Sequence, residues 1–368
     1  MAGNSFGRIL RLTTFGESHG VGLGGVLDGC PAGIALDEAD LQRDLDLRRP
    51  GRGAASSPRR ESDTVHILSG LFEGRTTGTP IAFYVANEDM RSRDYSSIAG
   101  IFRPGHADWG YFQKFGLRDY RGGGRSSGRE TLARVAAGAI AEKILAREGI
   151  VCHAGCIELG GVPAPEPYDL SGASDREFFA ASAAAPPLFA ARVEEARREA
   201  DTLGGLVRLV AANVPPGLGE PVFDKLEAVL AHAMMSVGAV RGVEVGAGFA
   251  ASRLTGSANN DRILPPGAPD GIRGRGATNG ASFASNNAGG IAGGISTGQD
   301  IVLTVAVKPI PSIGQTQVSL DESGRERTFR VGGRHDLAAI PRIVPVLLAM
   351  LRLVLADALL LQRREGAF

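Results

Sequence analysis

The sequence predicts an α+β protein whose helices and strands form layers in one large domain. Strand-like and helix-like runs are mixed along the chain, without the one-to-one alternation that is typical of a doubly wound parallel sheet. The 368 residues are 43% hydrophobic and 22% charged, which is enough apolar material for a sizeable core and excludes a wholly disordered chain. Glycine accounts for 52 residues, about twice its usual share, so the backbone is expected to turn tightly or approach something closely in many places.

The first part of the chain predicts strands, one helix and an arginine-rich loop. Asp37 is expected to cap the helix, which carries Asp40 in its first turn and ends near Leu47. The runs on either side have the apolar pattern of strands and are bounded by glycine and polar residues. The expected elements are strands at residues 6–14, 21–27, 65–71 and 80–85, a turn at 16–20 and a loop at 48–60.

A helix over residues 129–148 is expected next. Ser127 and Glu130 have the spacing of a capping box at its start, and Gly149 ends it. Further along, Pro221 suits the first turn of another helix. The remaining expected elements are strands at 150–159, 206–214, 240–249 and 301–307, helices at 188–202, 221–235 and from about 338, and a loop rich in glycine and asparagine at 259–294.

The most membrane-like stretch, residues 343–361, carries Arg352 and Asp357 in its middle. Both charges are costly at a bilayer centre, so the stretch is expected to be a helix buried between protein layers. The first eleven residues lack the apolar region of a signal peptide. The three cysteines fit neither a secreted disulfide framework nor a four-cysteine metal site, so we expect a cytoplasmic protein without a metal.

The charge balance argues against nucleic acid or a membrane as a partner. Forty Lys and Arg residues balance forty Asp and Glu residues, so no net field attracts a polyanion or an anionic membrane. An RNA-binding protein that uses the Gly/Arg stretches at 122–129 and 273–276 is the non-enzymatic alternative. One tryptophan and five tyrosines leave few side chains for stacking on bases, which disfavours it.

Two segments have the chemistry of an anion site. The glycine-rich segment 122–128 opens into a helix, where free N–H groups and the helix dipole favour an anion, although it could equally be only a cap and a turn. Arg48 and Arg49 belong to a second cluster, with three more arginines and no acid over residues 48–60. Guanidinium groups bind carboxylate and phosphate through two hydrogen bonds, so this loop suits a small polyanion, and a solvated surface loop is the alternative.

Other candidate residues lie at turns and strand ends. His19 and His106 sit in turns beside charged residues, where an imidazole can act as a general acid or base. Lys308 ends an apolar strand, and Asp336 precedes the last helix. The run at 286–296 contains four glycines and has little to pack, so its backbone is expected to lie against a flat ligand or another chain.

Taken together, these segments resemble the chorismate synthase family over about residues 3–361. Five motifs carry the resemblance in order, at residues 13–20, 103–108, 124–131, 289–298 and 333–336. It implies a β-α-β sandwich, with helices layered between antiparallel sheets, that assembles as a homotetramer. It also implies elimination of phosphate from 5-enolpyruvylshikimate 3-phosphate, with loss of a C6 proton, to give chorismate. Reduced FMN would be required with no net redox change.

The resemblance also implies roles for individual residues. His19 would protonate the departing phosphate, His106 would act beside the flavin ring, and Asp336 would assist proton removal through the flavin. Residues implied to bind the substrate are Arg48, Arg49, Arg129 and Arg134. Residues implied to bind FMN are Arg125, Ser126, Ser127, Gly238, Ala239, Gly293, Lys308, Pro309, Ile310, Pro311, Ser312 and Arg334.

Three departures from the family pattern bear on function. Ala54 stands where many members carry an arginine assigned to contact with the substrate or NADPH, which argues against a built-in flavin reductase unless Arg52 compensates. NADPH would be needed only if the chain reduces its own flavin, and an external flavin reductase is the alternative. Gly238 stands where a larger polar residue is common. Residues 260–281 form a longer segment, expected to be a flexible lid or an assembly loop. A flavin-dependent oxidoreductase is the alternative enzyme, since reduced flavin beside a histidine also serves hydride transfer.

Overall fold

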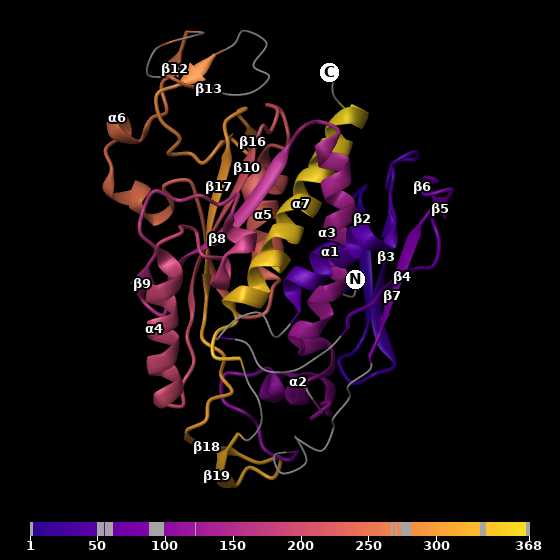
Figure 1. Cartoon of the computed structure of the whole chain (residues 1–368), viewed down its shortest axis with the longest axis vertical. Coiled ribbons are helices and arrows are strands. Elements are labelled where there is room, and N and C mark those ends of the chain that lie inside the picture. Colours follow the sequence, from indigo (N-terminus) through magenta and orange to yellow (C-terminus); the bar gives the residue numbers. More distant parts are fainter. Residues whose placement is uncertain are drawn as a thin grey trace.

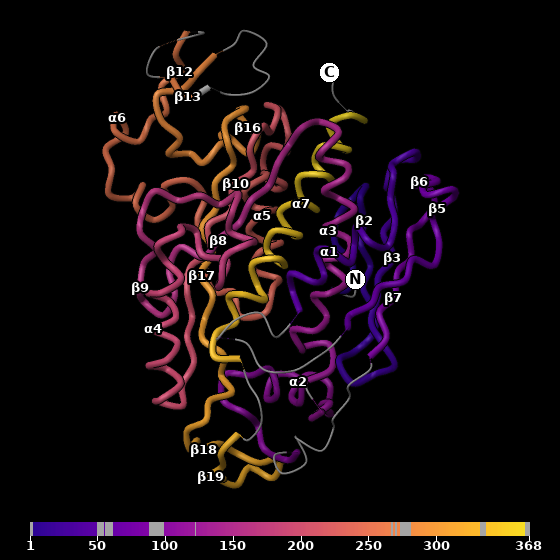
Figure 2. The backbone as a smooth tube through the Cα atoms, viewed as in Figure 1, coloured from indigo at the N-terminus to yellow at the C-terminus, as the bar shows by residue number. Residues whose placement is uncertain are grey.

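Two five-stranded antiparallel sheets enclose a layer of helices in the computed structural model (Figure 1). The structure describes residues 3–49, 55, 62–87, 99–121, 123–265, 268, 271–273, 281–331 and 336–365. Figure 2 shows the same layers as a backbone trace. The central helices are α1 (Glu38–Arg48), α3 (Thr131–Ala146) and α7 (Ile340–Glu365). This arrangement confirms the predicted α+β layers and the sandwich that the family resemblance implies.

The first sheet is built from the N-terminal part of the chain. Its strand order is β1-β2-β3-β7-β4, and each neighbouring pair is antiparallel. The single strand expected at 6–14 is wrong, because Gly7 adopts a φ of +92° and the chain turns there between two strands. The strands are β1 (Ser5–Phe6), β2 (Arg11–Gly16), β3 (Gly22–Asp28), β7 (Ile81–Ala86) and β4 (Val65–Ile67).

The second sheet has the order β11-β17-β10-β8-β9 and is also antiparallel. Three strands confirm the sequence pattern, and the strand at 301–307 has the expected bounds. The strand expected at 240–249 ends four residues early, since Gly246 turns the chain with a φ of +57°. The strands are β11 (Val240–Val245), β17 (Ile301–Val307), β10 (Gly205–Ala212), β8 (Val151–Leu159) and β9 (Val162–Pro163).

Helix α7 is the centre of the helical layer. It packs against α1 and α3 and against strands β8 and β10. Gly138 in α3 permits a close approach, since a Cβ there would lie 2.4 Å from Ala349 Cβ in α7. The helix is long and apolar enough to span a membrane, but 89% of its most apolar window is buried inside the protein. It is therefore a core helix, as its interior charges predict.

Both interior charges of α7 bind other elements. Arg352 donates to Asp44 of α1 at 2.6 Å and to Glu142 of α3 at 2.5 Å, so one guanidinium joins all three central helices. Asp357 accepts hydrogen bonds at 2.8–2.9 Å from the backbone N–H groups of residues 8–10. These bonds tie the turn between β1 and β2 to the core, because a buried backbone donor is costly to leave without an acceptor.

Helix α1 confirms its predicted cap, with Asp37 and Asp40 exchanging side-chain and backbone hydrogen bonds. The helix expected at 188–202 begins earlier because its first turn contains two prolines. The helix expected at 221–235 is shorter, because a separate 3-10 turn, Val222–Asp224, precedes it. The other helices are α2 (Asp108–Phe115), α4 (Ala185–Arg198), α5 (Leu226–Met235) and α6 (Gly256–Asn259).

The short strands outside the two main sheets form three two-stranded sheets and one three-stranded sheet, and the pattern of the sequence did not predict them. Part of the 260–281 segment forms β12 and β13, while residues 266–267, 269–270 and 274–280 lie outside the described residues, so its role as a lid or assembly loop stays a prediction. The short strands are β5 (Leu71–Phe72), β6 (Arg75–Thr76), β12 (Ile263–Leu264), β13 (Ile272–Arg273), β14 (Ser282–Phe283), β15 (Ile291–Ala292), β16 (Ile295–Ser296), β18 (Thr316–Leu320) and β19 (Glu326–Arg330).

The glycine run at 286–296 packs mainly on its own chain. A Cβ on Gly289 would lie 2.4 Å from the Gly246 nitrogen, one on Gly290 would lie 2.5 Å from Asp300 O, and one on Gly294 would lie 2.5 Å from Glu220 O. At these three positions the expected flat ligand or second chain is wrong, since the same chain fills the space. Gly293 alone in the run has open space around a Cβ.

The Asp357 cap predicts a graded loss of stability. Asp357→Ala leaves three backbone donors without their acceptor and should cost at least about 3 kcal/mol of unfolding free energy in urea titrations. Asp357→Asn retains one oxygen and should cost less than half of that. Glu326→Ala, on the exposed hairpin strand β19, is the control. Parental stability in Asp357→Ala would contradict this role.

Candidate functional site

A cavity of about 440 Å³ lies where the first turns of α3 and α7 meet the ends of β11 and β17. Figure 1 shows α3 and α7 beginning at the same end of the helical layer, near α2. Most residues that the sequence singled out converge here. Those that line the cavity are His19, Arg48, His106, Ser126, Ser127, Arg129, Gly238, Ala239, Lys308, Ile310, Pro311 and Asp336.

Two arginines in the cavity wall share one buried carboxylate. Arg48 Nη1 lies 3.4 Å from Asp63 Oδ2, and Arg129 Nη1 lies 2.9 Å from Asp63 Oδ1. The Asp63 side chain is fully buried, and the Arg48 side chain is 2% exposed. Arg48 also donates to Thr131 Oγ1 at 3.0 Å and to Gly128 O at 2.8 Å. These bonds join the end of α1 to the start of α3 and fix two cations at the cavity.

The cavity wall is rich in positive charge. Among the described residues, its cationic side chains are Arg48, Arg129, Arg241, Lys308 and Arg342, and its carboxylate is Asp336. Burial and the nearby Arg241 guanidinium lower the pKa of Lys308. Charge focused in a partly enclosed cavity acts more strongly than in water, so this wall selects a ligand with several negative charges.

His19 lies in the turn between β2 and β3. Ser18 Oγ is 3.1 Å from His19 Nδ1, within hydrogen-bonding distance. The carboxamide of Asn87 donates to Glu17 O at 2.9 Å and to Gly20 O at 2.7 Å, so it holds both ends of the turn. The imidazole is thereby presented to the cavity from a fixed backbone.

His106 is held by a network of ion pairs and hydrogen bonds. Arg103 binds Asp108 through Nε at 2.8 Å and Nη2 at 2.9 Å, which closes the loop between them. Burial alone would raise the pKa of Asp108, but the Arg103 guanidinium holds it below its usual value. Lys308 Nζ donates to Gly105 O at 2.7 Å, and Ser312 Oγ lies 2.8 Å from His106 Nε2. The end of β17 therefore positions the histidine loop.

Asp336 faces the cavity just before α7. Its carboxylate accepts from Arg342 Nη1 in the first turn of that helix at 2.9 Å, and its side chain is 10% exposed. The preceding residues 332–335, including Arg334, lie outside the described residues. Ala54 also lies outside them.

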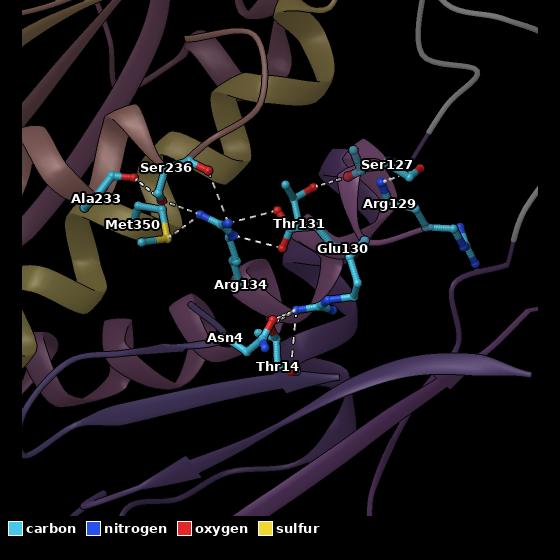
Figure 3. Close-up of polar contacts among 12 residues, drawn as sticks. Asn4, Thr14, Ser127, Arg129, Glu130, Thr131, Arg134, Ala233, Ser236 and Met350 are labelled. Atoms are coloured by element: carbon cyan, nitrogen blue, oxygen red, sulfur yellow. Dashed lines mark hydrogen bonds and ion pairs between the residues drawn. The ribbon is translucent and has the colours of Figure 1, made fainter. Parts of the chain in front are cut away.

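The capping box predicted for Ser127 and Glu130 is wrong. Two 3-10 turns, Gly124–Ser126 and Gly128–Glu130, precede α3, and Ser127 Oγ accepts from Arg129 N at 3.3 Å (Figure 3). Glu130 instead binds the Arg134 guanidinium, with 2.9 Å between Glu130 Oε1 and Arg134 Nη2. The tighter turns place Ser126 and Ser127 at the cavity wall, ahead of the α-helix.

Part of the cavity lining is apolar, and we call it the apolar wall. Gly238, Ala239, Ile310 and Pro311 contribute to it, together with residues from the first turns of α7. Ala239 has a φ of +75°, and its carbonyl accepts from Lys308 N at 2.9 Å, which links β11 to the end of β17. A Cβ at Gly238 would meet nothing within 4 Å, so the missing side chain leaves space.

Several predicted residues do not line the cavity. Arg134 binds Ser236 Oγ at 2.6 Å and ties α3 to the end of α5 (Figure 3). Arg125 donates to Thr14 Oγ1 at 2.6 Å and to Gly16 O at 3.1 Å on β2. Arg49 donates to Ser62 O at 3.2 Å. Gly293 lies in the turn between β15 and β16, Pro309 packs against Gly204, and Ser312 supports His106.

Sequence reasoning missed several residues at the cavity. They are Ser18, Thr131, Arg241 and Arg342 in its wall, and Asp63 and Asn87 behind it. Ser18 and Thr131 fall inside motifs that were recognised, so the motifs could have indicated them. The other four stand alone in the sequence and come together only through the fold.

Comparisons with known proteins identify the family of the chain. The family model for chorismate synthase matches residues 10–360. The chorismate synthase of Desulfovibrio desulfuricans is 64% identical over 368 residues, which cover 100% of this chain and 99% of the relative. That of Nitratidesulfovibrio vulgaris strain Hildenborough is 61% identical over 364 residues, which cover 99% and 98%.

A crystal structure of a chorismate synthase matches with a TM-score of 0.76 at 33% sequence identity and covers 99% of this chain and 95% of its own. Family, relatives and solved structure thus agree over nearly the whole chain. The chain therefore belongs to the chorismate synthase family, the lyases that form chorismate in aromatic amino acid biosynthesis.

Proposed function

We propose that this cavity eliminates phosphate from 5-enolpyruvylshikimate 3-phosphate, with loss of a C6 proton, and requires reduced FMN that is not consumed. The observation that carries the proposal is the cationic wall, in which five basic side chains stand against one carboxylate among the described residues. The substrate carries a phosphate and two carboxylates. Guanidinium groups match both kinds of anion through paired hydrogen bonds.

The residues present fit a flavin. The volume of about 440 Å³ lies in the range of small-molecule sites. The apolar wall with its open Gly238 suits a planar ring, while Ser126, Ser127 and Lys308 offer polar contacts to the cofactor. When bound, reduced FMN would supply an electron transiently to the substrate, which leaves no net redox change. NADPH would enter only if the chain reduces its own flavin, and otherwise an external reductase serves.

The side chains at the cavity have separate roles in the proposed reaction. Arg48 and Arg129, oriented by Asp63, hold substrate anions in place before any bond breaks. His19 gives a proton to the departing phosphate as the carbon–oxygen bond breaks. His106, supported by Ser312, acts at the flavin side, and Asp336, held by Arg342, assists removal of the C6 proton.

The proposal extends to compartment and assembly. A cytoplasmic location suits the three reduced cysteines, all of which are buried. The family resemblance implies a homotetramer, and exposed apolar side chains such as Phe223 at 90% and Phe249 and Leu117 at 71% are available for contacts between subunits. A flavin-dependent oxidoreductase remains the second candidate, on the strength of His106 at the apolar wall.

Phosphate release under anaerobic conditions tests the function. With chemically reduced FMN, each flavin should support many turnovers of the enolpyruvyl substrate, and without flavin release should cease. A requirement for one equivalent of reductant per product would instead identify an oxidoreductase. Equal turnover without flavin would contradict the proposed requirement for reduced FMN.

Arg48→Lys tests whether Arg48, in the cationic wall, binds the substrate. An ammonium group cannot reproduce the three separate contacts of the Arg48 guanidinium, and loss of charged hydrogen bonds of about 1.5–3 kcal/mol should lower kcat/KM about 10- to 100-fold. Arg147→Lys, at the far end of α3, is the control. Unchanged kinetics in Arg48→Lys would show that Arg48 does not bind substrate.

The two histidines should differ in kind. His19→Ala should slow phosphate release about 10²- to 10⁴-fold with FMN still bound, because it removes the general acid. His106→Ala should alter the absorbance of bound reduced FMN. Both lie in turns, so their melting temperatures should stay near that of the parent. His232→Ala, in α5 outside this cavity, is the control. Parental kcat and unchanged flavin absorbance in both variants would contradict these roles.

A further inference from the structure

One neutral side chain connects the turn of His19 to Arg129. Asn87 follows strand β7 directly, and its backbone N–H donates to Val21 O at 3.1 Å. Its Nδ2 donates to two carbonyls of the histidine turn, as described above, and its Oδ1 accepts from Arg129 Nε at 2.7 Å. The same arginine reaches Asp63 through Nη1. The carboxamide thus uses both donors and its acceptor.

The chemistry of the three partners requires an amide in this orientation. Glu17 O and Gly20 O can only accept hydrogen bonds, and a guanidinium can only donate them. A carboxylate at this position would face two carbonyl oxygens without a proton to donate. A hydroxyl group would offer one donor where two are used.

We propose that Asn87 is a positioning residue that fixes the separation between the proton donor, His19, and the substrate-binding Arg129. It does not line the cavity, so it acts through these two residues and not on the substrate. The inference rests on the proposed function and adds a positioning residue to it. Phosphate can leave only when His19 and the anion-binding Arg129 are at the right distance from each other, because a misplacement of about 1 Å can lower the rate about 100-fold.

A double-mutant cycle tests the coupling. Asn87→Ala should lower kcat for phosphate release about 10- to 100-fold and raise the substrate KM, since the turn and Arg129 both lose their tether. In a His19→Ala background the same change should lower kcat less than threefold, because the donor it positions is already absent. A merely structural role would lower kcat equally in both backgrounds.

Controls separate this proposal from folding and from the proposed function. Gln42→Ala removes another amide that bridges two elements, from Asp46 to Val65 N, and should leave kcat and KM unchanged. Asn87→Ser keeps one hydrogen-bond donor, so it should retain part of the rate that Asn87→Ala loses. If Asn87→Ala does not fold, Asn87→Ser takes its place in the double-mutant cycle. Equal losses in both backgrounds, or parental kinetics in Asn87→Ala, would overturn the positioning role. If the parent chain itself releases no phosphate, the proposed function fails instead.

Discussion

The site depends on the burial of Asp63 between two guanidinium groups. A buried carboxylate is stable only when it is paired, and here Arg48 and Arg129 are both its partners. The pairing fixes the end of α1, the turn before α3 and the segment around Asp63, just ahead of β4, at one point. These three residues carry two positive charges and one negative charge, so the cluster keeps a net positive charge at the cavity. The ion pairs with Arg48 and Arg129 offset the cost of removing the Asp63 carboxylate from water.

The core supports this cluster from a distance. Arg352 of α7 fixes the position of α1 and α3 along α7 through its hydrogen bonds to both helices, and Gly138 lets α3 and α7 pack closely. Both helices therefore begin at the same end of the layer, where Arg129 and Arg342 stand. The segment that follows β17 contributes Lys308 and Ser312, so the second sheet positions His106 while the first positions His19. The reactive groups that the two sheets position therefore meet at the cavity, where α3 and α7 begin.

Local pattern predicted the elements with strong periodicity or clear caps. Strand β17 and the Asp37 cap of α1 came from such signals, and motifs indicated His19, His106, Arg48 and Arg129. Asp63 and Asn87 carry no local signal, because their partners at the cavity lie far away in the sequence. Arg342 has a near partner in Asp336, but only the packing of α7 brings it to the cavity wall. The capping box at Ser127 failed because 3-10 turns compete with an α-helical start. The β18–β19 hairpin was missed because its strands are largely exposed and polar.

The central claim is that the cationic wall recognises the phosphate together with the carboxylates. Equilibrium binding of 5-enolpyruvylshikimate 3-phosphate, compared with the same molecule lacking its phosphate, tests this most directly. The account predicts that loss of the phosphate weakens binding at least about tenfold, as expected for about 1.5–3 kcal/mol of charge-assisted hydrogen bonding, and that the difference shrinks in Arg48→Lys. Equal affinity for both molecules in the parent protein would contradict it.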